Sequence, residues 1–301
     1  MLVTQVLIVL SGAAVRLTGS GLGCSDWPRC EDDRFVAPLE LNPMIEFGNR
    51  LVSFLVVATV VWAIWAALRR VPYRRDLLNL VWWITALTAA QIVIGGITVQ
   101  THLWPPVVMA HFLISMWIIA IAVTLHHRAS VDIEDEPPRA RAVSAATTRL
   151  MSPLAWLMGA VLVTGTVVTG SGPHGGDEHV ERLGFYIPTV ARIHAVTVIV
   201  FVALLVATLL LVRRSPGAER VLRAGTIALT ATFAQGAIGY YQYLNGVPAL
   251  AVYLHVAGSM AVLGTLGWFM LEHRHHQQSA ADTSRSAPDG HTTSRSPTVT
   301  T

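Results

Sequence analysis

The sequence predicts an all-α integral membrane protein whose eight transmembrane helices form two pseudo-symmetric four-helix bundles. Three observations predict this fold class. Only 13% of the 301 residues are charged and 53% are hydrophobic, whereas about a quarter of a soluble domain is charged. Long apolar windows recur along the chain, and the second half of the sequence repeats the first at a spacing of about 145 residues.

Seven apolar windows are long enough to cross a bilayer, which takes roughly 20 residues in a helix. An earlier segment, 1–15, is short; it either starts at the true beginning of the protein or belongs to a chain with residues before Met1. It lacks a basic region and a small-residue cleavage site, so we do not expect a signal peptide. The seven windows are 51–68, 77–101, 103–125, 150–172, 193–212, 224–248 and 249–271.

The arginines predict the orientation, because the sequence contains no lysine. Arginine clusters follow the second, fourth and sixth predicted spans, and cytoplasmic loops of membrane proteins are rich in such charges. We therefore expect both termini in the cytoplasm, and we attribute the formal charge of +3 to this bias and not to a nucleic-acid surface. The clusters are Arg69, Arg70, Arg74 and Arg75; Arg128, Arg139, Arg141 and Arg149; and Arg213, Arg214, Arg220 and Arg223.

The internal repeat is visible in short motifs. "LTGSG" at 17–21 matches "VTGSG" at 168–172, and "QIVIGG" at 91–96 matches "QGAIGY" at 235–240. Four spans in each copy keep both copies in the same orientation, related by an axis along the membrane normal. The predicted division is an N-terminal half at 1–127, a cytoplasmic linker at 128–149, a C-terminal half at 150–272 and a disordered cytoplasmic tail at 273–301.

The repeat places four polar residues at equivalent positions near the non-cytoplasmic ends of alternate spans: Asn49, His111, His194 and His255. A lone membrane histidine is often only a helix–helix hydrogen-bonding group. Two imidazoles from facing helices of a bundle, however, can be the two axial ligands of a haem iron. The pattern favours such a pair in the second half, and favours it over zinc, which normally takes three or four protein ligands.

The predicted loop after the first span contains both cysteines, Cys24 and Cys30. Outside the cytoplasm we expect them to be paired. The pair is either a structural staple or a disulfide that is exchanged during function. Among the loop histidines, His174 in "GSGPHGG" is the best candidate to cap or gate a site.

Seven motifs together resemble the haem A synthases, over residues 8 to 272. In chain order they are "RLTGSGLGCSDWPRC", "IEFGNR", "QIVIGGITV", "LWPPVVMAH", "VVTGSGPHGGD", "ARIHA" and "LHVAGSMA". The resemblance implies a multi-pass protein of the bacterial plasma membrane that oxidises the C8 methyl group of haem O to the formyl group of haem A, for terminal oxidases. Haem O synthase and oxidase assembly proteins are the implied partners, besides membrane lipid.

The resemblance also implies residue roles. A haem b cofactor would have His194 and His255 on its iron, and haem O would lie beside Glu46 and His111. Cys24 and Cys30 match the family's paired loop cysteines.

One position departs from the family's commoner Glu-x-x-His-Arg pattern, because this chain has Asn49 where that pattern has histidine. The first half therefore offers His111 as its one imidazole ligand. Either the substrate haem is held by His111 alone, or the chain is a non-catalytic protein that binds or carries haem. A dihaem quinol-linked cytochrome would need a second histidine pair.

Two charged residues flank this position. Glu46 is expected to accept protons during the oxidation or, alternatively, to pair with an outer-loop arginine. Arg50 is expected to hold a haem propionate or, alternatively, to be an ordinary interfacial arginine.

Overall fold

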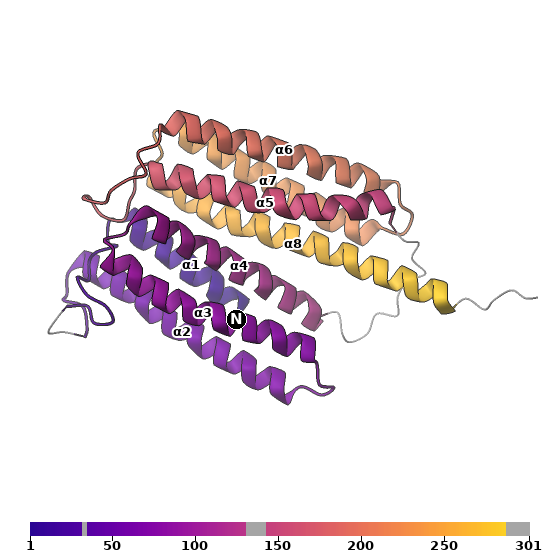
Figure 1. Cartoon of the computed structure of the whole chain (residues 1–301), viewed down its shortest axis with the longest axis horizontal. Coiled ribbons are helices and arrows are strands. Elements are labelled where there is room, and N and C mark those ends of the chain that lie inside the picture. The colour runs from indigo at the N-terminus through magenta and orange to yellow at the C-terminus, as the bar shows by residue number, and fades with distance from the viewer. Residues whose placement is uncertain (32–34, 131–142, 287–301) are drawn as a thin grey trace, which may run out of the picture.

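The computed structural model describes residues 1–31, 35–130 and 143–286, and the described residues form eight helices (Figure 1). Seven of these helices are long and apolar enough to cross a membrane. The predicted all-α membrane fold class is confirmed. The helices are α1 (Leu2–Leu17), α2 (Leu41–Arg69), α3 (Arg75–Gln100), α4 (Pro105–Ser130), α5 (Ala145–Ser171), α6 (Ile187–Arg213), α7 (Glu219–Leu244) and α8 (Ala249–Ser286).

The first helix is the exception in length. α1 has 16 residues, which at a rise of 1.5 Å per residue makes it about 24 Å long. It is apolar but shorter than the other seven.

Several helices extend beyond their apolar windows because a helix continues through polar residues until its backbone pattern is interrupted. α2 begins at Leu41, with Pro43 in its first turn, where proline is tolerated. Glu46, Asn49 and Arg50 therefore lie inside the helix and not ahead of it. α4 continues to Ser130 and α5 begins at Ala145, so both ends of the predicted linker are helical; residues 131–142 of that linker lie outside the described residues.

The predicted disordered tail is wrong for residues 273–286, which continue α8. This stretch contains no glycine or proline, and the next proline is Pro288. The extension also packs against α5: His273 is buried, its Nε2 lies 3.4 Å from the Thr148 hydroxyl, and Gln277 donates to the carbonyl of Val143 at 2.9 Å. Residues 287–301 lie outside the described residues.

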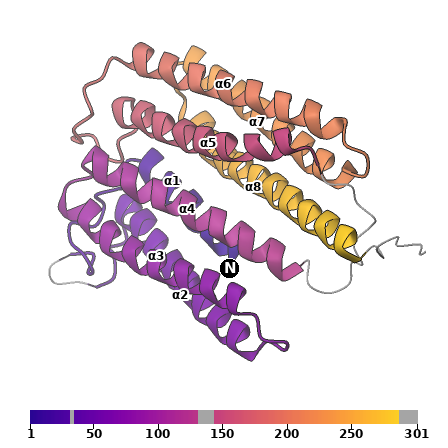
Figure 2. The same cartoon turned by 45° about the vertical axis from the view of Figure 1, so that its right-hand side comes forward.

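The helices pack as two groups of four, α1–α4 and α5–α8, and α4 and α8 meet between them (Figures 1 and 2). The grouping follows the sequence repeat, while the residue at which each half ends stays a prediction. Met116 of α4 and Met260 of α8, which are equivalent in the repeat, pack in one cluster with Ile119. Equivalent residues that touch each other lie near the axis that relates the two copies.

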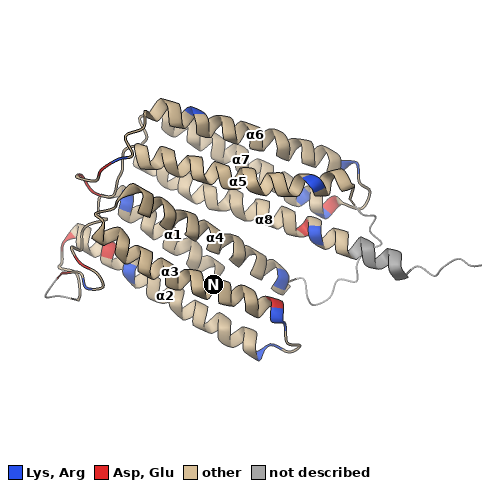
Figure 3. Ribbon diagram, in the orientation of Figure 1, with Lys and Arg blue, Asp and Glu red and all other residues tan. Residues whose placement is uncertain are grey.

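Charged side chains lie mainly towards the two ends of the helices, and the middle of the molecule is almost free of them (Figure 3). We call the end that carries Cys24 and Cys30 the disulfide end. The connections α1–α2, α3–α4, α5–α6 and α7–α8 lie there, by the alternation of the helices. This distribution is that expected of a bundle whose middle lies in hydrocarbon.

Each half has an apolar core, which lies away from the disulfide end. In the first half the core cluster is Val56, Val60, Ile84, Ile118 and Ala122. In the second half it includes Leu154, Phe201, Leu205, Val262 and Phe269.

Candidate functional site

The four repeat-related positions share one depth and one helix face. On α2, α4, α6 and α8 a residue of the two apolar cores lies seven residues after the site position: Val56 after Asn49, Ile118 after His111, Phe201 after His194 and Val262 after His255. Seven residues are about two helical turns, or roughly 10 Å, so both residues of each pair lie on the same face. All four side chains therefore belong to the interior face, between the apolar core and the disulfide end.

In the second half, a threonine hydroxyl on α5 fixes the tautomer of His194. The Thr164 hydroxyl donates to the carbonyl of Ala160 at 2.8 Å, so its oxygen accepts the N–H of His194 Nδ1 at 3.0 Å. The proton then resides on Nδ1, and Nε2 keeps its lone pair. An outer hydrogen bond of this kind orients an imidazole that binds a metal.

The second imidazole, His255 on α8, is positioned by α7. Gln235 donates through Nε2 to the main-chain carbonyl of His255 at 2.7 Å. A Cβ on Gly239 would stand 3.0 Å from His255 Cε1, so the absence of a side chain at Gly239 lets the ring lie against the α7 backbone.

The first half repeats the α7–α8 arrangement on α3 and α4. Gln91 donates to the main-chain carbonyl of His111 at 2.9 Å, as Gln235 does to His255. A Cβ on Gly95 would stand 3.7 Å from His111 Cε1, as one on Gly239 would stand near the His255 ring. The glutamine, the glycine and the histidine thus recur as one structural unit.

Asn49 occupies the position of His194 in structure as well as in sequence. The Ser11 hydroxyl of α1 donates to Asn49 Oδ1 at 2.6 Å, as the Thr164 hydroxyl of α5 pairs with His194. Gly12, next to Ser11, faces the Asn49 amide, and Gly165, next to Thr164, faces the His194 ring. Both halves thus have a hydroxyl residue followed by glycine at this place. The residue that contacts the pair differs: it is Asn49 in the first half and His194 in the second.

The residues of the second half fit a haem. His255 Nδ1 and Gln235 Oε1 are buried and have no hydrogen-bond partner among the described residues. A Cβ at Gly165 or Gly239 would crowd a histidine ring at 3.2 or 3.0 Å. Two imidazoles, an oriented Nε2 and a flat glycine surface are what a bis-histidine haem requires.

The corresponding atoms in the first half, His111 Nδ1 and Gln91 Oε1, are also buried without a partner. The first half thus offers one imidazole, that of His111, to a haem. Within the ranges that the structure describes, no group of three or more His, Cys, Asp or Glu side chains could hold a single metal ion.

Glu46 and Arg50 tie the disulfide loop to α2. Cys24 and Cys30 form the expected disulfide, and both are fully buried. The Cys24 N–H donates to Glu46 Oε2 at 2.7 Å, and Glu46 Oε1 accepts from Arg50 at 2.6 Å. Glu46 is only 5% exposed, so this carboxylate lies beneath the loop and not at the surface. Its cationic partner is an arginine of its own helix, not one from the loop.

The guanidinium of Arg50 is directed at the loop backbone. It donates to the carbonyl of Arg29 at 2.7 Å and to that of Asp26 at 3.0 Å. The contacts of Arg50 in this structure are therefore with the loop that covers the first half. The same guanidinium was predicted to hold a haem propionate, and that role stays a prediction.

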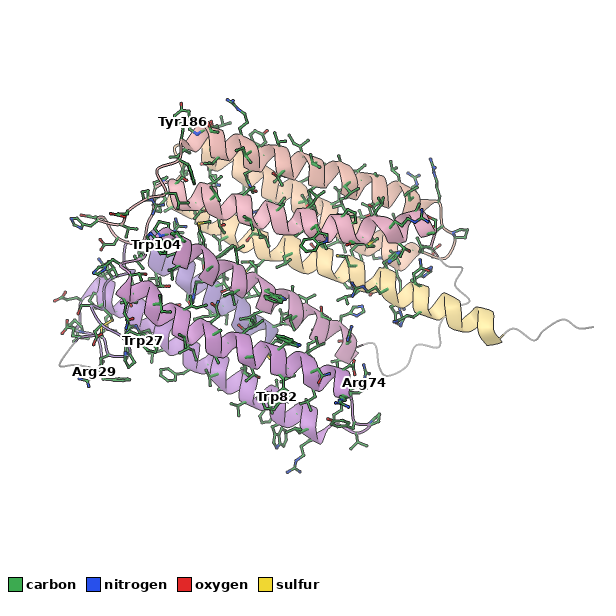
Figure 4. All side chains as sticks on the ribbon, viewed as in Figure 1. Trp27, Arg29, Arg74, Trp82, Trp104 and Tyr186 are labelled. Atoms are coloured by element: carbon green, nitrogen blue, oxygen red, sulfur yellow. A yellow bond between two sulfur atoms is a disulfide. The ribbon has the colours of Figure 1, made fainter. Side chains whose placement is uncertain are left out.

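The disulfide loop also inserts Trp27 against α3 (Figure 4). A Cβ on Gly96 would stand 2.9 Å from the Trp27 ring, so this glycine makes room for the indole. Gly95 and Gly96 thus face two different groups, the His111 ring and Trp27. The equivalent of Gly96 in the second half is Tyr240, which is exposed.

His174 links two connections at the disulfide end of the second half. Its Nε2 lies 2.8 Å from the carbonyl of Val247, and both residues have positive φ angles, 62° and 58°. The α5–α6 connection is thereby held over the α7–α8 turn. The predicted role of His174 in capping or gating a site stays a prediction.

Sequence reasoning missed Ser11, Thr164 and Trp27. The signal for the first two was present, because "SG" at 11–12 and "TG" at 164–165 precede the two matching "TGSG" motifs. Trp27 had no comparable signal, since its contact depends on how the loop folds back.

Comparison with known proteins identifies the family. The model of COX15-CtaA, described as a cytochrome oxidase assembly protein, matches residues 1–43 and 36–173. His194 and His255 lie beyond the matched residues.

Similar proteins include the Heme A synthase of Geobacillus kaustophilus, 33% identical over 35% of this chain and 33% of that protein. The Heme A synthase of Symbiobacterium thermophilum is 36% identical over 30% of this chain and 29% of that protein. The Heme A synthase of Staphylococcus epidermidis is 26% identical over 56% of this chain and 55% of that protein. The matched part of this chain thus spans between about a third and about half of these relatives. Because the family model covers more than half of the chain, this protein belongs to the COX15-CtaA family of cytochrome oxidase assembly proteins.

Proposed function

We propose that this protein is a haem A synthase, which oxidises the C8 methyl group of haem O to a formyl group. The observation that carries the proposal is the unequal pair of sites: imidazoles stand at both of the equivalent positions on α6 and α8, whereas an amide and an imidazole stand at those on α2 and α4. A resident cofactor fits the first arrangement, and a substrate that enters and leaves fits the second. The similarity to proteins named Heme A synthase supports the same activity.

In the second half, His194 and His255 would hold a haem b. When bound through two imidazoles, such a haem supplies one-electron transfer. Thr164 keeps the lone pair of His194 on Nε2, and Gly165 and Gly239 let both rings approach α5 and α7. These residues orient the ligands. The apolar core, which begins about two helical turns further from the disulfide end, keeps water from that side of the site.

In the first half, His111 would hold haem O from one side. Asn49 is engaged by Ser11, and an amide oxygen is a poor ligand for haem iron compared with imidazole. The substrate is thereby held by one strong protein ligand and not by two. This arrangement allows haem A to leave after the reaction.

Glu46 would accept the protons that leave the substrate carbon. Both of its oxygens already accept hydrogen bonds, from the Cys24 N–H and from Arg50, but each carboxylate oxygen has a second lone pair. The ion pair with Arg50 favours the charged form of the carboxylate, and the burial of Glu46 beneath the disulfide loop strengthens its interaction with a nearby proton donor.

The arginine distribution supports a location in the bacterial plasma membrane with the disulfide end outside and both termini in the cytoplasm. Haem O synthase and terminal oxidase assembly proteins are the partners that this activity requires, as source and destination of the porphyrin. The buried Cys24–Cys30 disulfide, tied to Glu46, is a staple of the covering loop in this arrangement.

The test is the pigment content of a bacterial host that makes haem O but no haem A. Expression of this protein is expected to produce a haem with a formyl group, identified by its mass and by its pyridine haemochrome spectrum. Unchanged haem O, with full expression of the protein in the membrane, would contradict the proposal.

A second function is favoured by one observation: Arg50 and Glu46 both hold the disulfide loop in this structure. If these residues only build the loop, the protein binds or carries haem without oxidising it. In that case the same host accumulates haem in the purified protein, and the extracted pigment is haem O or haem b and not haem A.

A further inference from the structure

Two arginines from different halves of the chain converge on one carbonyl at the disulfide end. Arg16, at the end of α1, donates to the carbonyl of Thr169 at 3.0 Å. Arg182, in the α5–α6 connection, donates to the same oxygen at 2.8 Å and to the carbonyl of Pro173 at 3.4 Å. The two positive charges are close enough to repel each other.

The described residues provide this pair with no acidic partner. The last turn of α5, which contains Thr169, contributes the partial charge of a helix C-terminus, equivalent to roughly half a negative charge. Two guanidinium groups therefore leave more than one positive charge uncompensated. Burial lowers the pKa of Arg182, and its Nε is buried without a hydrogen-bond partner, which costs free energy unless an acceptor is supplied.

The glycine-rich connection is built around these two side chains. A Cβ on Gly175 would stand 2.5 Å from a terminal nitrogen of Arg182, and one on Gly176 would stand 3.8 Å from Arg16 Cγ. Gly176 has a φ of 105°, which favours glycine, and its carbonyl accepts from the Gly21 N–H at 2.7 Å. The motif "GSGPHGG" thus covers the two arginines, and its hydrogen bond with Gly21 joins the two halves.

The two arginines lie nearer the disulfide end than the first-half site. Arg16 is five residues beyond Ser11 on α1, about 7.5 Å nearer the disulfide end, and Ser11 contacts Asn49. On α4, Met109 lies 3.4 Å from the position that a Cβ on Gly170 would take, and His111 is two residues further along that helix. The arginines therefore stand at the seam of α1, α4 and α5, between Asn49 and the disulfide end.

We propose that Arg16 and Arg182 together bind a propionate carboxylate of the porphyrin in the first half, so that a connection of the second half completes the substrate site. This inference rests on the proposed function for its ligand. Guanidinium groups bind carboxylates through parallel N–H donors, and each arginine directs few of its five N–H groups to the protein. Arg50, in contrast, is engaged by Glu46 and the loop carbonyls.

The test compares two probes on the purified, detergent-solubilised protein with its resident haem: iron protoporphyrin IX and its dimethyl ester, which lacks the carboxylate charges. The dissociation constant of each added porphyrin is measured by absorbance titration. In the wild-type protein the acid is expected to bind at least about 10-fold more tightly than the ester, which corresponds to one charge-assisted contact. Equal affinities would overturn the proposal without any variant.

Three variants locate the contact. Arg16→Gln and Arg182→Gln are each expected to bring the acid-to-ester ratio close to one, and Arg182→Lys is expected to retain part of it. Arg192→Gln is the matched control, because Arg192 is an exposed arginine near the disulfide end of α6 and its loss changes the net charge equally. The absorbance of the resident haem shows that each variant is folded.

Two results would contradict the assignment. A ratio that persists in both glutamine variants would place the propionate contact elsewhere. A wild-type ratio of one, with affinity for inorganic phosphate that both variants lose, would make the pair a site for a phosphate group such as that of a lipid. Conversion of haem O to haem A is measured separately in cells, so failure of the arginine assignment is distinguishable from failure of the proposed function.

Discussion

The side chain of Asn49 accepts a hydrogen bond from the hydroxyl of Ser11 at 2.6 Å. In the second half, the hydroxyl of Thr164 meets His194 Nδ1 at 3.0 Å in the equivalent place. The first half therefore retains the partner that would orient an imidazole at position 49. At this position the two halves differ in one side chain, which is the amide of Asn49 in the first half and the imidazole of His194 in the second.

Replacing this residue should equalise the two halves. We expect Asn49→His to place an imidazole against Ser11 and opposite His111, which would give the first half two nitrogen ligands. Porphyrin bound in the first half should then dissociate at least roughly 10-fold more slowly, because a second ligand bond must break. The turnover of haem O should fall by a similar factor if release of haem A limits the rate. The measurements are dissociation of added haem to apomyoglobin and haem A yield.

Asn49→Gln is the control for this change, because it keeps the amide and alters only its reach. Unchanged dissociation and unchanged yield in Asn49→His would show that position 49 does not face the substrate.

The imidazole pair of the second half should be essential for the resident haem. We expect His194→Ala and His255→Ala each to abolish the low-spin b-type absorbance of the purified protein, because one imidazole cannot supply both axial ligands. His126→Ala, which removes an exposed histidine of α4, should leave the spectrum intact. A protein that keeps full low-spin absorbance in either of the first two variants would refute the ligand assignment.

The glycine that faces His255 gives a test of packing. A Cβ at Gly239 would stand 3.0 Å from the ring, whereas nothing lies within 4 Å of a Cβ at Gly236 on the same helix. Gly239→Ala should displace the ring and lower haem occupancy, and Gly236→Ala should have no such effect. Haem-to-protein ratios of the two purified variants make the comparison, and equal ratios would mean that the ring position is not set by α7.

The covering loop should depend on the contact between Trp27 and α3. Gly96→Val places a branched side chain where the indole lies 2.9 Å from the built Cβ, and should free the loop. We expect faster alkylation of Cys24 and Cys30 after mild reduction than in the wild type. Gly48→Val, at a glycine with no atom within 4 Å of its Cβ, is the control; equal alkylation rates in the two variants would argue against the contact.

Hydrophobicity and the repeat were sufficient to predict the eight helices and the equivalence of Asn49, His111, His194 and His255, because both are recorded directly in the order of residues. The end of α8 was not predictable from the lack of apolar periodicity, since the residues after 272 are held by contacts of His273 and Gln277 with α5.

The contacts of the candidate site were predictable only in part. The convergence of Arg16 and Arg182 joins residues 166 positions apart through a glycine-rich connection. No local pattern encodes such a meeting, because it depends on how the two halves pack. Glu46 was predicted to lie near the site, but its link to Cys24 depends on the fold of the loop.

The most direct test of the account compares Glu46→Gln with the wild-type protein in a host that makes haem O but no haem A. Glutamine keeps the shape and can still accept from the Cys24 N–H, but it cannot take up a proton. We expect wild-type cells to convert haem O to haem A. Glu46→Gln cells should yield roughly 100-fold less haem A, because a general base contributes a rate factor of about this size. The b-type spectrum of the purified variant should be unchanged. Equal haem A yields from the two strains, or none from either, would contradict the account.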